Sequence, residues 1–99
     1  MGQFESGIQT GIVEEAVAVY GSRIWIRVKH GTAYAVVGDP DLYGCLEGDF
    51  FGMEVKNEDN QLTKIQKRRL YEIAQAGGNA AGVRSVSEAM SLFQQWRKR

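Results

Sequence analysis

Residues 38–56 read GDPDLYGCLEGDFFGMEVK, and this stretch decides the fold. Two short apolar segments, 41–46 and 50–56, lie on either side of a turn-forming Glu-Gly-Asp at residues 47–49. This pattern predicts a β-hairpin. A hairpin of this length places the polar side chains at the start of its first strand beside those at the end of its second.

The open end of this hairpin carries three polar side chains that can meet. Residues i and i+2 of a strand point to the same side, so Glu54 and Lys56 lie next to each other while Val55 faces the other way. Alone, that tripeptide is equally typical of an ordinary surface ion pair. Asp41, however, is predicted to lie on the neighbouring strand, where its carboxylate converges with that of Glu54.

Two converging carboxylates repel each other and favour a bound divalent cation, and Mg²⁺ prefers oxygen ligands. We therefore predict a magnesium site formed by Asp41, Glu54 and the backbone carbonyl of Val55. A cation there would polarise a phosphodiester, and Lys56 would orient the attacking water or stabilise the developing charge. The pattern predicts a metal-dependent nuclease that needs no histidine base.

Residues 4–20 have the apolar periodicity of a helix with two apolar sides, which predicts a helix packed between the sheet and a partner. One side is formed by Ile8, Ile12, Ala16 and Val19, and the nearly opposite side by Val13, Val17 and Tyr20. Residues 23–29 alternate as a strand does, and residues 30–38 are predicted to form a loop.

The sequence after the hairpin has the pattern of a second helix followed by another strand. Thr63 is a good N-cap for a helix that runs to about Ala76. Gly77-Gly78 follows directly and ends it. Residues 79–86 are predicted to form the next strand.

Ser87 is predicted to cap a last helix over residues 88–96, whose Phe93 and Trp96 face the core. The element order is then α-β-β-β-α-β-α. The fold class is α/β, with a small mixed sheet flanked by helices in a single domain over residues 1–99.

Two polar side chains fall on the apolar side of the helix that follows Thr63. Gln66 lies at its centre, which predicts that its amide reaches the carboxylate site, whereas the long side chain of Arg69 can also reach solvent. In the first helix, Glu5 and Glu15 both project onto the inward stripe. Either can add a carboxylate to the metal site, and geometry does not choose between them.

The chain has no net charge, but its charges are unevenly distributed. Residues 1–60 hold ten acidic and four basic side chains, whereas residues 61–99 hold two acidic and eight basic ones. An acidic cation site beside a basic surface suits a phosphodiesterase, although such segregation also arises by chance.

With a single cysteine, Cys45, no signal-peptide pattern and no long apolar run, we expect a cytoplasmic protein without a membrane segment.

Taken together, these residues resemble the virus-type replication-repair nuclease (VRR-NUC) domain, a branch of the PD-(D/E)xK nuclease superfamily. The similar segments are Gly38–Gly44 (G-x-P-D-L), Glu54–Lys56 (E-x-K), Leu62–Gln66 (L-T-x-x-Q), Gly77-Gly78 with Val83–Val86 (the closing glycines and strand) and Glu5–Ile8 (E-x-x-I). The last of these segments favours Glu5 over Glu15 as the carboxylate of the first helix.

The resemblance implies a restriction-endonuclease-like core and a homodimer that cuts four-way (Holliday) junctions with Mg²⁺ or Mn²⁺, in a bacterium or a phage-infected cell. Paired cuts in a two-fold junction fit a two-fold dimer. A flap or nicking nuclease of the same fold is one alternative, and a non-cleaving DNA-binding subunit is another. The catalytic residues would be Glu5, Asp41, Glu54, Lys56 and Gln66, with Glu5 as a further metal ligand.

Six basic residues are expected to contact DNA phosphates without reading the base sequence. They are Lys64, Lys67, Arg68, Arg97, Lys98 and Arg99. The last three can equally be a frayed basic tail. The dimer interface would use the second apolar side of helix 4–20, with Trp25 as a further candidate.

Overall fold

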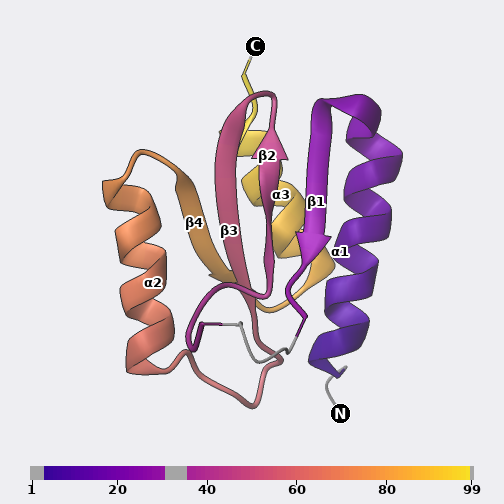
Figure 1. Cartoon of the computed structure of the whole chain (residues 1–99). Helices are drawn as coiled ribbons and strands as arrows, with labels where there is room; N and C mark the ends of the chain where they lie inside the picture. Colours follow the sequence, from indigo (N-terminus) through magenta and orange to yellow (C-terminus); the bar gives the residue numbers. More distant parts are fainter. Residues whose placement is uncertain (1–3, 31–35, 99) are drawn as a thin grey trace.

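The computed structural model describes residues 4–30 and 36–98, which form a four-stranded sheet, three α-helices and one 3-10 turn (Figure 1). In chain order the elements are α1 (Glu5–Tyr20), η1 (Gly21–Arg23), β1 (Ile24–Val28), β2 (Leu42–Leu46), β3 (Asp49–Val55), α2 (Lys64–Gln75), β4 (Asn79–Val83) and α3 (Val86–Trp96). The predicted order is therefore confirmed. Within the described part of the chain, no helix is long and apolar enough to cross a membrane.

The sheet has the order β1-β2-β3-β4, antiparallel over its first three strands and parallel between β3 and β4. The predicted hairpin joins β2 to β3, with Leu42 opposite Met53. Its turn residues Glu47 and Gly48 have φ angles of 51° and 94°, and positive values at both positions match the twist of a tight hairpin. The parallel pair needs a longer crossover, which contains α2.

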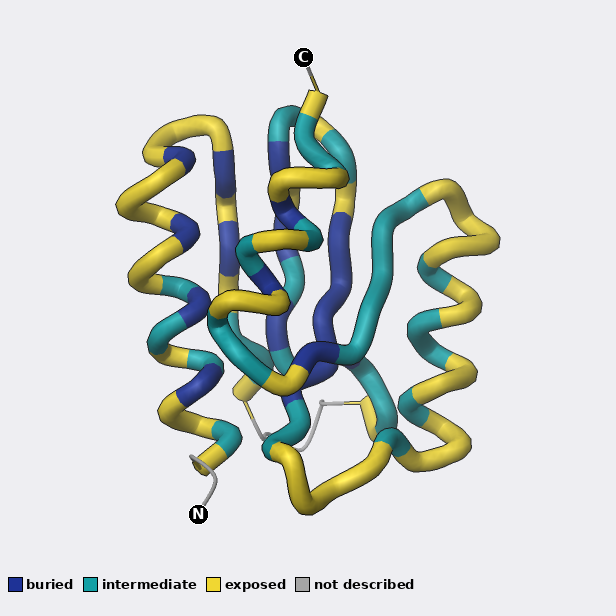
Figure 2. The backbone as a smooth tube through the Cα atoms, turned by 180° about the vertical axis from the view of Figure 1, so that it is seen from behind, coloured by how far each residue is buried: buried dark blue, intermediate teal, exposed yellow. Residues whose placement is uncertain are grey.

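The core lies between one side of the sheet and the helices α1 and α3 (Figure 2). Phe51 and Met53 of β3 and Ile12 of α1 are fully buried there. Phe93 of α3 packs edge-on against Phe51 and Tyr20, with ring centroids 5.0 and 6.3 Å apart. This one-sided core fixes which residues of β3 face inward and which face outward.

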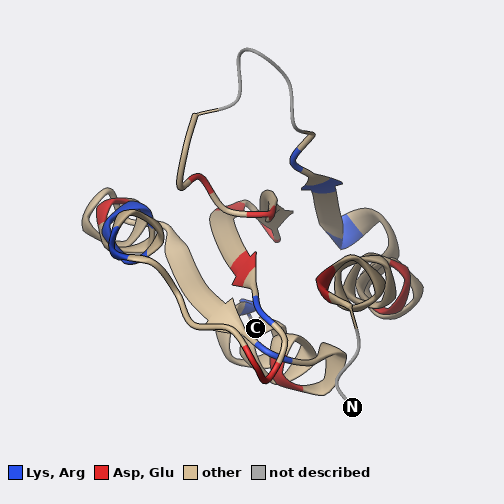
Figure 3. Ribbon diagram, turned by 90° about the horizontal axis from the view of Figure 1, so that it is seen from below, with Lys and Arg blue, Asp and Glu red and all other residues tan. Residues whose placement is uncertain are grey.

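Helix α2 lies on the other side of the sheet and packs against β3 and β4 (Figure 3). Gly52 and Gly78 permit this approach, because a Cβ atom at either position would come within 2.7 or 2.9 Å of Ile73. The three helices leave the outward side of β1, β2 and the start of β3 uncovered. We call the exposed and half-exposed side chains there the open face: Trp25, Arg27, Tyr43, Cys45 and Phe50.

The boundary between the last strand and the last helix differs from the prediction. β4 ends at Val83, and α3 begins at Val86 with Ser85 as its N-cap, so the predictions of a strand to residue 86 and a cap at Ser87 were wrong. The Ser85 hydroxyl accepts the N–H of Glu88 at 3.0 Å. The side chain of Val86 packs against the core from the first turn of α3.

The inward side of α1 also differs from the prediction, near its C-terminal end. Its buried line is Ile8, Ile12, Ala16 and Tyr20. Val19, predicted to face inward, is 50% exposed, while Tyr20 is buried because its ring reaches α3. Residues four apart lie above one another on a helix, and the large ring extends that line by one turn. Val17 on the second apolar side is 49% exposed.

The close approach of β1 and β2 depends on Gly44. A Cβ atom there would overlap the backbone carbonyl of Trp25. We expect Gly44→Ala to lower the free energy of unfolding by about 3 kcal/mol, because the clash involves backbone rather than a movable side chain. Gly7→Ala is the matched control: nothing lies within 4 Å of its Cβ position in α1, so it should stabilise by about 0.5–1 kcal/mol. Urea denaturation measures both, and equal stability of the two variants would contradict this account.

Candidate active site

Asp41 is held in place at the start of the hairpin by three neighbours. Its carbonyl accepts the N–H of Lys29 at 2.7 Å, which continues the β1–β2 pairing by one residue. Its carboxylate oxygen Oδ2 accepts the N–H of Val55 at 2.9 Å. Pro40, just before it, is buried against Gly52, where a Cβ atom would come within 2.9 Å of the proline ring. Val55 thus contacts Asp41 through its backbone N–H, whereas the sequence predicted that the Val55 carbonyl binds the metal.

Glu54 lies opposite Asp41 on β3, because the pairing of Leu42 with Met53 places the next residues of the two strands side by side. Its side chain points outward from the sheet and is nevertheless only 3% exposed. Gln66 of α2 donates from Nε2 to Glu54 Oε2 at 3.2 Å. The other oxygen, Oε1, is buried and receives no hydrogen bond from any described residue. The site therefore contains a buried carboxylate oxygen without a donor.

The surroundings of Glu54 favour its neutral form in the absence of a cation. Burial is the main cause that raises its pKa from 4.5 to about 8, and the negative charge of the facing Asp41 carboxylate acts in the same direction. The positive charges of Lys56 and Lys29 oppose the rise in this pKa.

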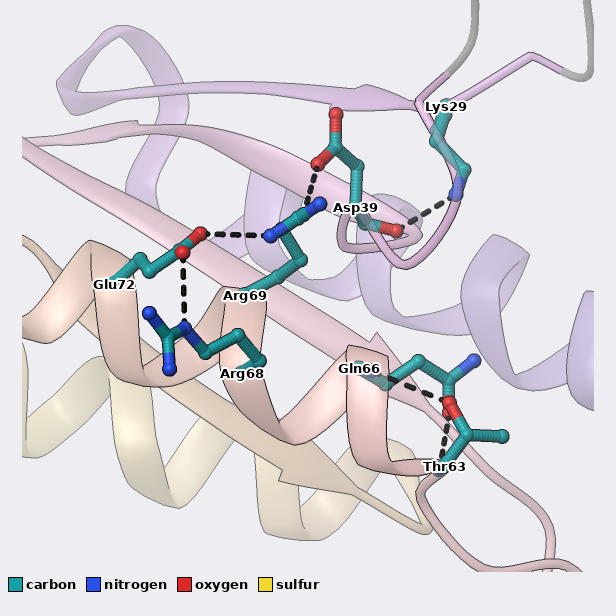
Figure 4. Close-up of polar contacts among 7 residues, drawn as sticks. All are labelled: Lys29, Asp39, Thr63, Gln66, Arg68, Arg69 and Glu72. Atoms are coloured by element: carbon teal, nitrogen blue, oxygen red, sulfur yellow. Dashed lines mark hydrogen bonds and ion pairs between the residues drawn. The ribbon is translucent and has the colours of Figure 1, made fainter.

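Gln66 is positioned by the start of α2 (Figure 4). Its side-chain Oε1 accepts the N–H of Thr63 at 2.9 Å, while the Thr63 hydroxyl accepts the N–H of Gln66 at 3.2 Å. This reciprocal capping box satisfies two N–H groups at the helix start. Because Oε1 is occupied, Nε2 is the end of the amide that faces Glu54. The predicted cap at Thr63 is thus confirmed, and the predicted inward direction of Gln66 agrees with the geometry.

Two lysines lie on either side of the carboxylates. Lys56 follows β3 directly, and its N–H donates to the carbonyl of Val83 at 2.9 Å. Lys29 follows β1, and its Nζ donates to the carbonyl of Asp39 at 2.7 Å (Figure 4). Sequence reasoning missed Lys29. The sequence did contain a signal for it. Lys29 is two residues after Arg27, so it lies on the same outward side of the first strand.

Arg69 connects α2 to the segment before Asp41 (Figure 4). Its Nε lies 3.6 Å from Asp39 Oδ1, and its Nη1 lies 3.0 Å from Glu72 Oε1. Arg68 approaches the other oxygen of Glu72 at 3.2 Å. The Arg69 side chain is 28% exposed, so it reaches the surface while it braces the loop against the helix.

Glu5 lies apart from the carboxylate pair. Its Oε2 accepts the N–H of Asn57 at 3.2 Å and the side-chain amide of Asn60 at 3.0 Å. Arg84 holds the same loop from the other side through the carbonyls of these two asparagines. Glu5 therefore anchors the loop between Lys56 and α2, and Glu15 is exposed. In the described ranges 4–30 and 36–98, no three acidic, histidine or cysteine side chains are grouped to hold a metal.

A cavity of about 160 Å³ lies beside Lys56, on the side away from Asp41. Its lining residues are Lys56, Leu62, Gly82, Val83, Arg84 and Glu88. One of its lining residues, Gly82, is opposite Glu54 in the β3–β4 register.

The basic residues predicted to bind DNA fall into two groups in the structure. Lys64, Lys67 and Arg68 are exposed on α2, the helix that carries Gln66. Lys98 lies beyond α3 and pairs with Asp49 Oδ1 at 3.4 Å, at the opposite end of β3 from Glu54. Arg97 precedes it, and Arg99 lies outside the described residues. Of the five described members, the three on α2 are the ones carried by an element that contacts the carboxylate pair, through Gln66.

Two solved structures share this architecture. A "VRR_NUC domain protein" superposes with a TM-score of 0.74 at 20% identity, over 97% of this chain and 89% of that one. A "VRR_NUC domain" superposes with a TM-score of 0.71 at 23% identity, over 93% of this chain and 96% of that one. The chain has the VRR_NUC fold. No protein-family model matches the sequence, and no curated protein matches it either.

Within this VRR_NUC fold, the three central segments of the predicted resemblance meet at one place. Asp41 comes from the G-x-P-D-L segment, Glu54 and Lys56 from E-x-K, and Gln66 from L-T-x-x-Q. The predicted fold is confirmed. Because likeness at these identities establishes the fold alone, the chemistry of the site has to be argued from its own geometry.

The buried carboxyl of Glu54 predicts a pH-dependent stability. Its pKa is about 8 when folded and near 4.5 when unfolded, so between these values the folded state binds the extra proton. Without metal, the free energy of unfolding should fall as pH rises from about 5 to about 8, by on the order of 3 kcal/mol. Glu54→Gln should remove this fall, while Glu14→Gln, at an exposed position of α1, should retain it. Urea denaturation in EDTA checks this, and an unchanged pH slope in Glu54→Gln would refute it.

Proposed function

We propose that the chain is a metal-dependent DNA endonuclease, with Asp41 and Glu54 holding Mg²⁺ or Mn²⁺. The observation that carries the proposal is Glu54 itself: a carboxylate that is 3% exposed, faces a second carboxylate and keeps one oxygen without a donor. An unpaired buried oxygen is costly in a merely structural carboxylate. In a cation site, that oxygen is the free ligand position.

The residues present fit a magnesium-type cation. Mg²⁺ keeps several of its waters and commonly binds proteins through one or two carboxylates. Asp41 and Glu54 supply these, and Gln66 fixes the remaining oxygen of Glu54. When bound, the cation would polarise the phosphodiester and lower the pKa of a bound water.

Other residues of the chain would bind and orient the DNA and the attacking water. Lys56 carries a positive charge beside Glu54, where it would bind a non-bridging phosphate oxygen or orient the attacking water. In the hydrolysis, a water oxygen forms a bond to phosphorus, one phosphorus–oxygen bond to sugar breaks, and the departing oxygen takes up a proton. The cavity beside Lys56 offers room for the group next to the cut phosphate. Lys64, Lys67 and Arg68 would bind phosphates farther along the strand.

Within this class we propose branched DNA as the substrate, in particular a Holliday junction cut by a homodimer. Support comes from the sequence resemblance and from the VRR_NUC fold, together with an exposed apolar residue on α1, Val17, that a second copy can cover. A flap or nicking nuclease uses the same site on another branched substrate. The non-cleaving binding subunit is less favoured, because a binding module gains nothing from paired buried carboxylates. Glu5 would then support the site from the loop after Lys56 rather than as a ligand.

The first test of the nuclease is cleavage of labelled four-way, flap, splayed and linear DNA with Mg²⁺, Mn²⁺ or EDTA. We expect paired symmetric cuts in the junction, and loss of at least about 100-fold in rate for Asp41→Asn and Lys56→Met, as for removal of other groups that stabilise developing charge. Glu14→Gln is the control and should cut like wild type.

Metal binding has an independent readout. Mg²⁺ should raise the melting temperature of wild-type protein and of Glu14→Gln, but not that of Asp41→Asn. Absence of cleavage on all four substrates would refute the endonuclease, and cutting of flaps alone would replace the junction resolvase with the flap nuclease.

The dimer is tested by sedimentation velocity. Val17→Glu should convert the dimer to a monomer, because it places a charge in the apolar contact. Val19→Glu, an equally exposed valine on the other flank of α1, should remain dimeric. A wild-type protein that stays monomeric at micromolar concentrations would argue against paired cutting.

A further inference from the structure

The open face carries aromatic and basic side chains in rows that lead to the candidate active site. In the strand register, Trp25 lies opposite Cys45, and Cys45 opposite Phe50. The next row places Arg27 opposite Tyr43. The following row contains Lys29, Asp41 and Glu54. Since alternate residues of a strand are about 7 Å apart, Tyr43 and Arg27 adjoin the carboxylates directly.

Trp25 lies between two neighbouring side chains, those of Arg27 and Tyr43. The guanidinium carbon of Arg27 lies 4.3 Å from the centroid of the Trp25 ring, and its Nη1 donates to the carbonyl of Ile26 at 3.0 Å. The Tyr43 ring lies 6.2 Å from that of Trp25, at an interplanar angle of 58°. Trp25 is nevertheless 48% exposed, and Phe50 is 43% exposed. Large side chains are thus fixed in position while much of their surface stays in solvent.

The charges on this side of the sheet favour an anionic, aromatic occupant. Arg27 and Lys29 form no ion pair with any described carboxylate. The outward positions of β1 and β2 and of the residues that extend them hold two acidic side chains. Asp41 belongs to the site, and Glu47 pairs with Arg23 at 3.4 Å at the opposite end of β2. A second copy of the chain docking here about a two-fold axis would bring the same cations toward each other. A nucleic-acid strand instead brings phosphates for the cations and bases for the rings.

We propose that the open face binds unpaired bases of the DNA strand that is cut, stacked on Trp25, Tyr43 and the Arg27 guanidinium. This inference rests on the proposed nuclease and adds that bases at the branch point, beside the cut phosphate, are held unpaired when the branched DNA is bound. Aromatic rings and guanidinium planes both accept stacked bases of any sequence. Such a platform selects DNA structure rather than base sequence.

The test uses the intrinsic fluorescence of Trp25. Trp96→Phe removes the other tryptophan while it keeps an aromatic ring against Phe51 and Phe93. In EDTA, which prevents cleavage, oligothymidylate should quench the remaining fluorescence, and a blunt duplex at the same nucleotide concentration should quench it less. In the wild-type background, Trp25→Leu should weaken binding of oligothymidylate by about 5- to 100-fold. Phe4→Leu, at an aromatic residue exposed off the open face, should leave it unchanged.

Two results would overturn the proposal. One is equal binding of oligothymidylate by Trp25→Leu and wild type. The other is Trp25 fluorescence that changes with protein concentration alone, together with loss of a dimer in Trp25→Leu, which would assign this surface to a second copy. Failure of the nuclease is distinguishable: quenching by oligothymidylate without cleavage of any substrate supports the platform and refutes the enzyme. Cleavage of duplex arms without such quenching supports the enzyme and refutes the base-binding role of the open face.

Discussion

A carboxylate buried beneath a helix is costly to keep ionised, and in this protein that carboxylate belongs to Glu54. Its outward position on β3 would normally give it access to water. The crossover from β3 to β4 carries α2 over it, and the glycines at positions 52, 78 and 82 allow this close approach. The arrangement excludes water from Glu54 while Lys56, Lys29 and Gln66 partly compensate its charge.

The hairpin determines which groups surround this carboxylate. Asp41 is opposite Glu54 because a tight turn at Glu47-Gly48 fixes the register between β2 and β3. A shift of that register by one residue would turn Glu54 toward the core and expose Met53. The fully buried Met53 and Val55 therefore set the direction of Glu54. Core packing on one side of the sheet thus positions the candidate chemistry on the other.

Most of the fold could be predicted from the sequence because its signals are local. The hairpin, the Thr63 cap and the element order follow from turn residues, capping side chains and apolar periodicity. The choice between Ser85 and Ser87, and the outward turn of Val19, depended on packing between α3, α1 and the sheet. Such packing has no local signal.

The site was predictable to a similar degree. Asp41, Glu54 and Gln66 follow from strand alternation and a helical projection. Periodicity could not predict two sets of contacts in the site. They are those of Lys29 with Asp39 and of Glu5 with Asn57 and Asn60. They join segments whose relative placement is set by loops, and loops have no periodicity to follow. The separation of Lys98 from the α2 lysines likewise depends on the tertiary fold.

The capping box at the start of α2 restricts the choice of residue at position 66 more than either of its contacts alone. One end of the Gln66 amide accepts the N–H of Thr63, and the other donates to Glu54. Glutamate has the acceptor for the cap but would face Glu54 with a second negative charge, and leucine has neither group. Asparagine has both groups on a side chain one methylene shorter. Among the natural side chains, glutamine alone combines both groups with this reach, so helix initiation and the state of the buried carboxylate are coupled through a single amide.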